Sequence, residues 1–224
     1  MCNPMSRHIT THALLLFSVL FLFAPDGKAG ETSQKLVPGV YEFLMLAVDP
    51  GNEVLGFYRE SQGEGVVKTC SFFLKGRMKD GQANIASWSG LFHGPSIDEG
   101  KVFPGLLKNK GGNDVSLKIE RGPEHPGCGL VLMPQISDEG LVLERTNEAK
   151  WVSLKIVKND RAPLFSEPVS GKKTKSYFIK NDVLGVVSVH GVWINVEFPR
   201  EGKQPVKGWV KSNDVQDLQP PQTK

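Results

Sequence analysis

The sequence predicts an all-β protein, in which an N-terminal antiparallel β-barrel or β-sandwich is followed by a small C-terminal β-barrel. Two observations lead to this prediction. Short runs of alternating apolar and polar residues recur along the chain, and clusters of glycine, proline, asparagine and aspartate separate them. After the first thirty residues, no segment carries apolar residues at helical spacing over three turns.

The first element has the pattern of a secretory signal peptide. Arg7 supplies a positive charge, residues 13–24 form an apolar run too short to span a bilayer, and small residues ending at Ala29 follow it. We expect residues 1–29 to be removed, which leaves a periplasmic or secreted protein with no stable membrane span. An uncleaved anchor is the alternative. Cys2 precedes the apolar run, so a lipoprotein is disfavoured.

Charge and cysteine content restrict the class of the mature protein further. The full chain has a formal net charge of +3, and its basic residues are scattered, which argues against a nucleic-acid or anionic-membrane binder. Only Cys70 and Cys128 remain after residue 29. An even pair of cysteines in an exported protein is more often a disulfide than a metal site or two free thiols, so we expect this bridge.

The N-terminal β-domain is expected over residues 36–155, as a meander of six to eight strands. Asp49–Asn52 and Asp80–Gly81 are its strongest turn signals, and each lies between two strand-forming runs. Such a meander must close into a barrel or cover its edges, because exposed strand edges favour aggregation. The expected strands cover residues 40–48, 53–60, 69–78, 82–89, 101–108, 115–121 and 141–146.

Two turn-rich loops, residues 93–100 and 122–129, interrupt this domain. Residues 151–158 form a further strand-like run, which we interpret as an interdomain strand with a boundary near 155–161. The last segment, residues 219–224, is polar and rich in proline, and it has nothing to bury. We expect it to be disordered.

The C-terminal segment has a hairpin pattern of its own. Residues 183–189 and 192–198 are strand-forming runs joined at His190-Gly191. On the second run, alternation assigns Val192, Ile194, Val196 and Phe198 to one face and Trp193, Asn195 and Glu197 to the other. The aliphatic face is the expected core, so Trp193 is expected at the surface, where an indole ring can contact a ligand.

Residues 162–218 resemble the bacterial SH3-like family called SH3b. Three segments carry the resemblance: Ala162–Pro168 is similar to the first strand of the family, Tyr177–Asp182 to its aromatic-x-apolar-Lys-Gly-Asp motif, and Gly208–Val215 to its ending. Asn181 stands where glycine is usual, and asparagine tolerates a positive φ angle better than other residues.

The resemblance implies a non-catalytic binding module, which in several relatives recognises peptidoglycan or its stem peptides. It implies a partner surface built from Phe165, Trp193 and Trp209, with Asp182 or Glu197 as its polar rim. The alternative for each aromatic residue is core packing or protection of a sheet edge. The expected partner is therefore peptidoglycan or an envelope protein.

Other functions are weaker interpretations of the same sequence. Thr69-Cys70-Ser71 is reminiscent of the nucleophile of exported cell-wall peptidases, but Cys70 lies in a β-like run without the helix that would activate a thiolate. No residues have the spacing of a metal or cofactor site, so none is expected. Alternatively, the N-terminal domain encloses a small apolar ligand or inhibits another exported protein, and a ligand-holding barrel would need about eight strands.

Overall fold

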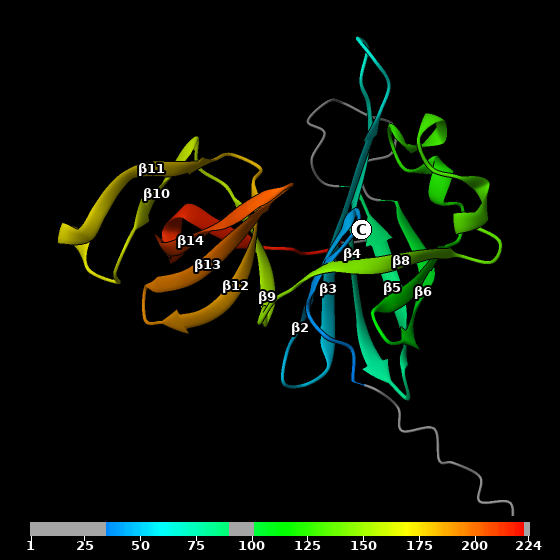
Figure 1. Cartoon of the computed structure of the whole chain (residues 1–224), viewed down its shortest axis with the longest axis horizontal. Helices are drawn as coiled ribbons and strands as arrows, with labels where there is room; N and C mark the ends of the chain where they lie inside the picture. Colours follow the sequence, from blue (N-terminus) through cyan, green and yellow to red (C-terminus); the bar gives the residue numbers. More distant parts are fainter. Residues whose placement is uncertain (1–34, 90–100, 222–224) are drawn as a thin grey trace, which may run out of the picture. The chain divides into compact units, whose positions relative to one another are not determined.

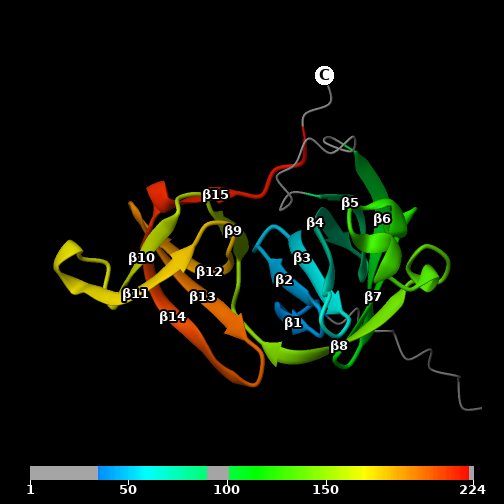
Figure 2. The same cartoon turned by 90° about the horizontal axis from the view of Figure 1, so that it is seen from above.

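The computed structural model describes residues 35–89 and 101–221. The predicted signal peptide, the loop at 93–100 and the end of the predicted tail lie outside the described residues. Two antiparallel sheets account for the described strands: a closed barrel, β1 to β8, and a curled seven-stranded sheet, β9 to β15 (Figures 1 and 2). The all-β prediction is confirmed, and the N-terminal domain is a barrel.

Each barrel strand pairs with the next along the chain, and β8 pairs with β1 to close the ring. The predicted hairpin at Asp80–Gly81 is confirmed, since both residues adopt the positive φ angles that such a tight turn requires. The barrel strands are β1 (Gly39–Tyr41), β2 (Leu44–Val48), β3 (Glu53–Gln62), β4 (Lys68–Lys79), β5 (Gln82–Trp88), β6 (Val102–Gly111), β7 (Asp114–Ile119) and β8 (Leu141–Glu148).

The first predicted strand, residues 40–48, is in fact two strands. The chain turns at Glu42 and Phe43, so that Tyr41 lies directly opposite Leu44. Glu42 takes up the turn with a φ of 47°. The prediction of a single strand was wrong because this apolar run contains no glycine, proline or asparagine to mark a turn.

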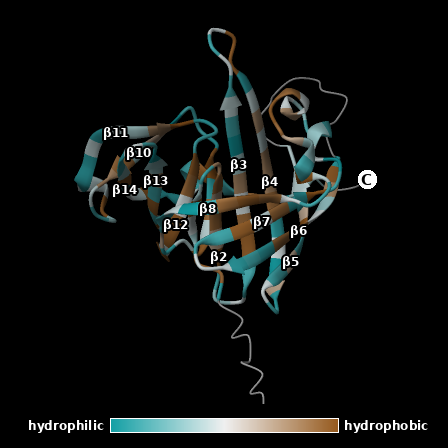
Figure 3. Cartoon of the chain, turned by 45° about the vertical axis from the view of Figure 1, so that its right-hand side comes forward, coloured by the Kyte–Doolittle hydropathy of each residue, from teal (hydrophilic) through white to brown (hydrophobic). Residues whose placement is uncertain are grey.

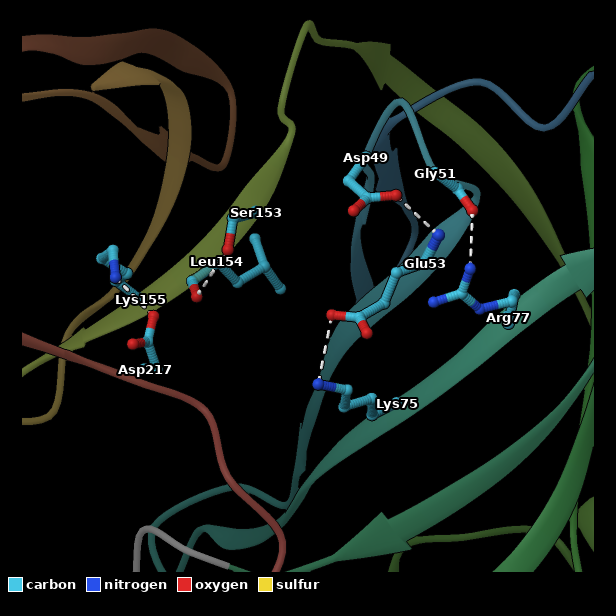
Figure 4. A network of polar contacts seen from close by, with 9 residues as sticks. All are labelled: Asp49, Gly51, Glu53, Lys75, Arg77, Ser153, Leu154, Lys155 and Asp217. Carbon is cyan, nitrogen blue, oxygen red and sulfur yellow. Dashed lines mark hydrogen bonds and ion pairs between the residues drawn. The ribbon is translucent and has the colours of Figure 1, made fainter. Parts of the chain in front are cut away.

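The turn between β2 and β3 is held by polar contacts that the sequence signal implies (Figure 4). A carboxylate oxygen of Asp49 accepts the backbone N–H of Glu53 at 2.7 Å. On the neighbouring strand β4, Arg77 donates to the carbonyl of Gly51 at 3.3 Å, and Lys75 pairs with Glu53 at 3.1 Å. Asp49–Asn52 therefore form the predicted turn.

Large side chains fill the interior of the barrel. Tyr41, Tyr58, Phe72 and Phe103 are almost completely buried there, together with leucine and isoleucine from six strands. Hydrophobic and hydrophilic stretches accordingly alternate along the barrel strands (Figure 3). The segment between β7 and β8 adds Val131, Leu132 and Ile136 to this core and contains the 3-10 turns η1 (Gly122–Glu124), η2 (Cys128–Leu130) and η3 (Pro134–Ile136).

The predicted disulfide between Cys70 and Cys128 is confirmed. It ties η2 to β4, and both cysteines are completely buried within the barrel core. Nearby, Gly127 lies so close to β4 that a Cβ atom at this position would be 2.5 Å from the carbonyl oxygen of Thr69. A buried disulfide of this kind is typical of proteins outside the cytosol.

The second sheet has the order β11-β10-β14-β13-β12-β9-β15. Its own core lies between Val157, Leu164, Phe178, Ile194 and Val210 and their neighbours. Its strands are β9 (Ser153–Val157), β10 (Arg161–Phe165), β11 (Lys173–Ile179), β12 (Val183–His190), β13 (Trp193–Arg200), β14 (Lys203–Lys211) and β15 (Val215–Asp217), with short 3-10 turns η4 (Ser170–Lys172) and η5 (Ser212–Asp214).

Strand β9 belongs to this second sheet, although the sequence suggested an interdomain strand. It pairs with β12 on one side and with β15 on the other, and Lys155 forms an ion pair with Asp217 across the latter pairing (Figure 4). The sheet therefore begins at Ser153, before the segment that resembles SH3b. The predicted domain boundary at 155–161 stays a prediction.

The outer face of barrel strands β2 to β5 is also buried. Met45, Phe57 and Phe73 form one apolar cluster with Leu154 and Ile156 of β9 and with neighbouring residues. Both faces of β2 are therefore covered, which explains why its five residues are apolar without alternation. The described residues belong to one compact unit, Ser33–Lys224.

Candidate functional site

The strand register of the second sheet brings the three aromatic candidates together. Phe165 on β10 lies opposite Trp209 on β14, and Trp209 lies opposite Asn195 on β13. Directly opposite residues in an antiparallel pair present their side chains on the same face, and so do residues two apart on one strand. Trp193, two residues before Asn195, therefore shares this face.

Two further side chains join the same face. Trp193 lies opposite His190 on β12 and opposite Lys211 on β14. We call the group Phe165, His190, Trp193, Trp209 and Lys211 the aromatic surface. The sequence contained a signal for both additions, because His190 precedes the hairpin turn and Lys211 is two residues beyond Trp209.

The rings of the aromatic surface contact one another edge to face. Phe165 and Trp193 have centroids 4.8 Å apart at an interplanar angle of 75°, and His190 and Trp209 have centroids 5.3 Å apart at the same angle. The ammonium nitrogen of Lys211 lies 5.6 Å from the ring of Trp193 and 5.9 Å from that of Phe165. These contacts hold the side chains in place before any partner binds.

Burial differs within the aromatic surface. Phe165 is buried, whereas Trp193 and Trp209 are half-buried and His190 and Lys211 are exposed. The predicted division of faces on β13 agrees with this, since Ile194 and Val196 lie in the core of the sheet and Phe198 packs against that core. It was wrong for Val192, which lies in the turn before β13 and is exposed.

Glu197 is engaged in contacts within the protein. One carboxylate oxygen accepts the indole N–H of Trp151 at 3.0 Å, and the other lies 2.7 Å from the ammonium nitrogen of Lys207. Glu197 is four residues from Trp193 along β13, a separation of about 13 Å. It supports the junction of the two sheets through Trp151.

Asp182 lies at the turn between β11 and β12. Its carboxylate accepts the backbone N–H of Ile179 at 2.9 Å. Partial burial raises the pKa of Asp182, while the bond from Ile179 and the nearby charge of Arg59 lower it to a smaller extent. The structure thus brings together three of the five predicted contact residues and engages Asp182 and Glu197 elsewhere.

The barrel presents a second unusual surface at one end. Val66 and Val67 lie at the tip of the long β3–β4 hairpin, and Leu130 and Met133 lie on the segment that the disulfide ties to it. All four are exposed, Leu130 by 76 %. The hairpin extends upward from the barrel in Figure 1, and Gln62 bonds it to the carbonyl of Val131 at 3.1 Å.

We define Val66, Val67, Leu130 and Met133 as the apolar end of the barrel; none of these residues was predicted as a contact residue from the sequence. The sequence contained a signal for it, because two adjacent valines follow the turn-forming stretch Gly63–Gly65. Turns exposed to solvent usually carry polar residues, so adjacent valines there indicate a contact surface. The cavity between hairpin and loop has a volume of about 640 Å³ and is lined in part by Val67 and Leu130.

His125 is buried inside the barrel, with only 2 % of its surface exposed. Its ring stacks on Phe72 and meets Phe103 edge-on. The hydroxyl of Ser87 donates to the carbonyl of Phe103, so it must accept from Nε2–H of His125 at 3.0 Å, which leaves Nδ1 to accept from Ser89 at 3.0 Å. Burial lowers the pKa of His125 to about 4.

Cys70 has no thiolate in this structure, because it is bonded to Cys128. Within residues 35–89 and 101–221, no group of three or more His, Cys, Asp and Glu side chains is arranged to hold a metal ion. The same two stretches contain no helix with the length and apolar character that a bilayer crossing requires.

Comparisons of the chain with models of protein families, with curated proteins and with solved structures find no match.

Proposed function

We propose that this is an exported, non-catalytic binding protein of the cell envelope, whose second sheet contacts peptidoglycan through the aromatic surface. One observation supports this above all. Two half-buried tryptophans and a lysine on neighbouring strands form one ordered surface, although they are separated in sequence and are not part of the sheet core. Tryptophans that stay partly exposed on one sheet face, each packed against a neighbouring ring, are unusual unless they contact a partner.

The chemistry of the aromatic surface suits this partner. An indole ring has an apolar face and an N–H donor on its edge, so it matches a ligand that is apolar on one side and polar on the other, as sugar rings and peptides are. Lys211 supplies a positive charge beside Trp193, and carboxylates of stem peptides supply the opposite charge. The resemblance of residues 162–218 to SH3b implies the same class of partner.

Export is supported by two independent features. Residues 1–29 have the charge, apolar length and small-residue ending of a signal peptide. The buried disulfide is typical of an oxidising compartment. Together they support a periplasmic or secreted protein, where peptidoglycan is accessible.

The test is sedimentation of the mature chain with purified peptidoglycan. The full mature chain is used because β9 belongs to the second sheet. A C-terminal fragment cut at the predicted boundary, near residue 156, would lack most of β9. We expect Trp193→Ala and Trp209→Ala each to weaken binding about tenfold, since tryptophan dominates many binding surfaces. Tyr177→Ala is the matched control, because Tyr177 is an exposed aromatic residue on edge strand β11 that packs with Arg161.

The proposal fails if the wild-type protein does not sediment, or if the tryptophan variants bind as tightly as Tyr177→Ala. If the wild-type protein instead binds an envelope protein, and the tryptophan variants lose affinity for it, that protein is the partner of the aromatic surface. Far-UV circular dichroism and thermal unfolding of each variant check that the sheet is intact.

A second candidate function rests on the apolar end of the barrel. Four exposed apolar side chains on two segments joined by a disulfide form a surface that suits contact with another protein. This favours the alternative in which the barrel inhibits another exported protein. The other alternative, a small apolar ligand inside the barrel, has the required eight strands, but such a ligand would have to displace the buried aromatic side chains.

A further inference from the structure

A cavity of about 590 Å³ lies between the barrel and the second sheet. Barrel strands β1 to β3 and β8 line one side, and the turns that flank β12 and β13 line the other. This volume is in the range of small-molecule and peptide sites, which occur preferentially where two structural units meet. The aromatic surface is elsewhere, because Phe198 in the cavity lies about 16 Å along β13 from Trp193.

The floor of the cavity is apolar. Met45 and Phe57 contribute from the outer face of the barrel, and Val183 and Phe198 contribute from the second sheet. Phe43, at the β1–β2 turn, lines the same cavity and has 43 % of its surface exposed. An apolar ligand that covers Phe43 would remove its ring from water, and this burial would contribute to the free energy of binding.

The rim of the cavity carries charges of both signs. Arg59 extends from β3, and among the described residues its guanidinium forms no ion pair or hydrogen bond. Asp182 lines the cavity from the second sheet, on the side opposite Arg59, and the positive charge of Arg59 acts to lower the pKa of its carboxyl group. One carboxylate oxygen of Asp182 accepts from Ile179, which leaves the other available.

The remaining charged residues of the rim are less suited to hold a ligand. Arg200 already donates twice to the carbonyl of Gln204, at 2.9 and 2.6 Å. Glu42 already accepts the backbone N–H of Glu144 at 3.5 Å, and Glu201 lies beyond the end of β13 in the turn to β14. Arg59 and Asp182 are therefore the pair that a ligand meets beside the apolar floor.

We propose that this cavity binds a short peptide with apolar side chains and free ends, with its carboxylate at Arg59 and its ammonium group at Asp182. A ligand with a single charge would pair with only one of Arg59 and Asp182. A zwitterion carries a charge opposite to each of them and can pair with both. An apolar side chain of the peptide would cover Phe43 and contact Phe57. This site is separate from the aromatic surface and goes beyond the proposed function.

The test uses isothermal titration calorimetry of the mature protein with four forms of the dipeptide Leu-Phe: free, N-acetylated, C-amidated, and blocked at both ends. We expect the free dipeptide to bind tightest, each single block to weaken binding about fivefold, and the doubly blocked form to bind weakest. Arg59→Gln should abolish the difference between free and amidated dipeptide and retain the effect of acetylation. Asp182→Asn should do the reverse.

Arg77→Gln is the matched control, because Arg77 is an arginine of the barrel outside this cavity. It should leave all four affinities unchanged. Equal binding of the four forms, no detectable binding of any, or an unchanged preference in Arg59→Gln would overturn the proposal. Arg59 is exposed, so its variant is expected to fold even if Asp182→Asn weakens the turn at Ile179. Trp193→Ala should retain dipeptide binding, which separates this result from failure of the wall-binding proposal.

Discussion

Acid should destabilise this protein through the buried His125. Its ring lies inside the barrel between Phe72 and Phe103, and both ring nitrogens are hydrogen-bonded to serine hydroxyls. Among the residues that the structure describes, no carboxylate pairs with it, and burial disfavours its charged form and lowers its pKa to about 4 from the ordinary 6.5. The unfolded chain therefore binds one more proton than the folded chain between these two pH values.

The sign and size of the effect follow from proton linkage. His125 is protonated more readily in the unfolded chain than in the folded one. The free energy of unfolding is therefore unaffected by His125 above pH 6.5 and decreases as the pH falls from 6.5 toward 4. At 1.4 kcal/mol for each pH unit, this interval corresponds to a loss of about 3 kcal/mol in the free energy of unfolding. That is a large part of the total stability of an ordinary domain.

Urea unfolding at a series of pH values between 7 and 4 measures this loss. His125→Phe is the comparison, because it keeps a flat ring in the stack and cannot titrate. The difference in the free energy of unfolding between wild type and variant should change by about 3 kcal/mol across the interval. Titration of the carboxylates changes the stability of both proteins equally and cancels in this difference. Parallel curves for the two proteins would refute the reasoning, and so would an NMR titration in which the His125 ring protonates near pH 6.5.

Two further predictions concern packing and covalent closure. Reduction of the Cys70–Cys128 bond should lower the free energy of unfolding by about 4 kcal/mol, because the bridge closes a loop with a sequence separation of 58, and chemical denaturation with and without reductant measures it. Gly185→Ala should cost about 1–3 kcal/mol in the same assay, because the new methyl group would lie 2.3–2.5 Å from ring atoms of the buried Trp151.

Each of these predictions has a control in the chain. For the disulfide, the double variant Cys70→Ala/Cys128→Ala should no longer respond to reductant, and equal melting of oxidised and reduced wild type would contradict the prediction. For Gly185, the matched change is Gly171→Ala, where no atom lies within 4 Å of the new methyl group. Equal stability of the two alanine variants would show that the Trp151 ring moves aside without cost.

The aromatic surface illustrates how far sequence alone reaches toward the candidate site. Alternation along β13 predicted that Trp193 leaves the core, because side chains on a strand point to opposite faces in turn. The neighbours of Trp193 depended on register with β12 and β14, and Glu197 looked equally available until Trp151 and Lys207 were found to occupy it. The sequence of a strand does not show which side chains from other segments contact each of its residues, so Trp193 and Glu197 could not be distinguished in this way.

Local chemistry determined what the sequence revealed by itself. The turn at Asp80–Gly81 was predictable because its φ angles depend on two adjacent residues, and the pairing of Cys70 with Cys128 followed from having only two cysteines after residue 29. The all-β class followed from alternation, which is a property of neighbouring residues.

Only the tertiary structure decided which strands meet. Closure of the barrel joins β1 to β8, whose paired residues Val40 and Asn147 are more than a hundred positions apart. It also assigned β9 to the second sheet, covered both faces of β2 and placed His125 inside the barrel. Such contacts depend on the packing of segments that are distant in sequence, and the pattern of any one segment does not specify its partner.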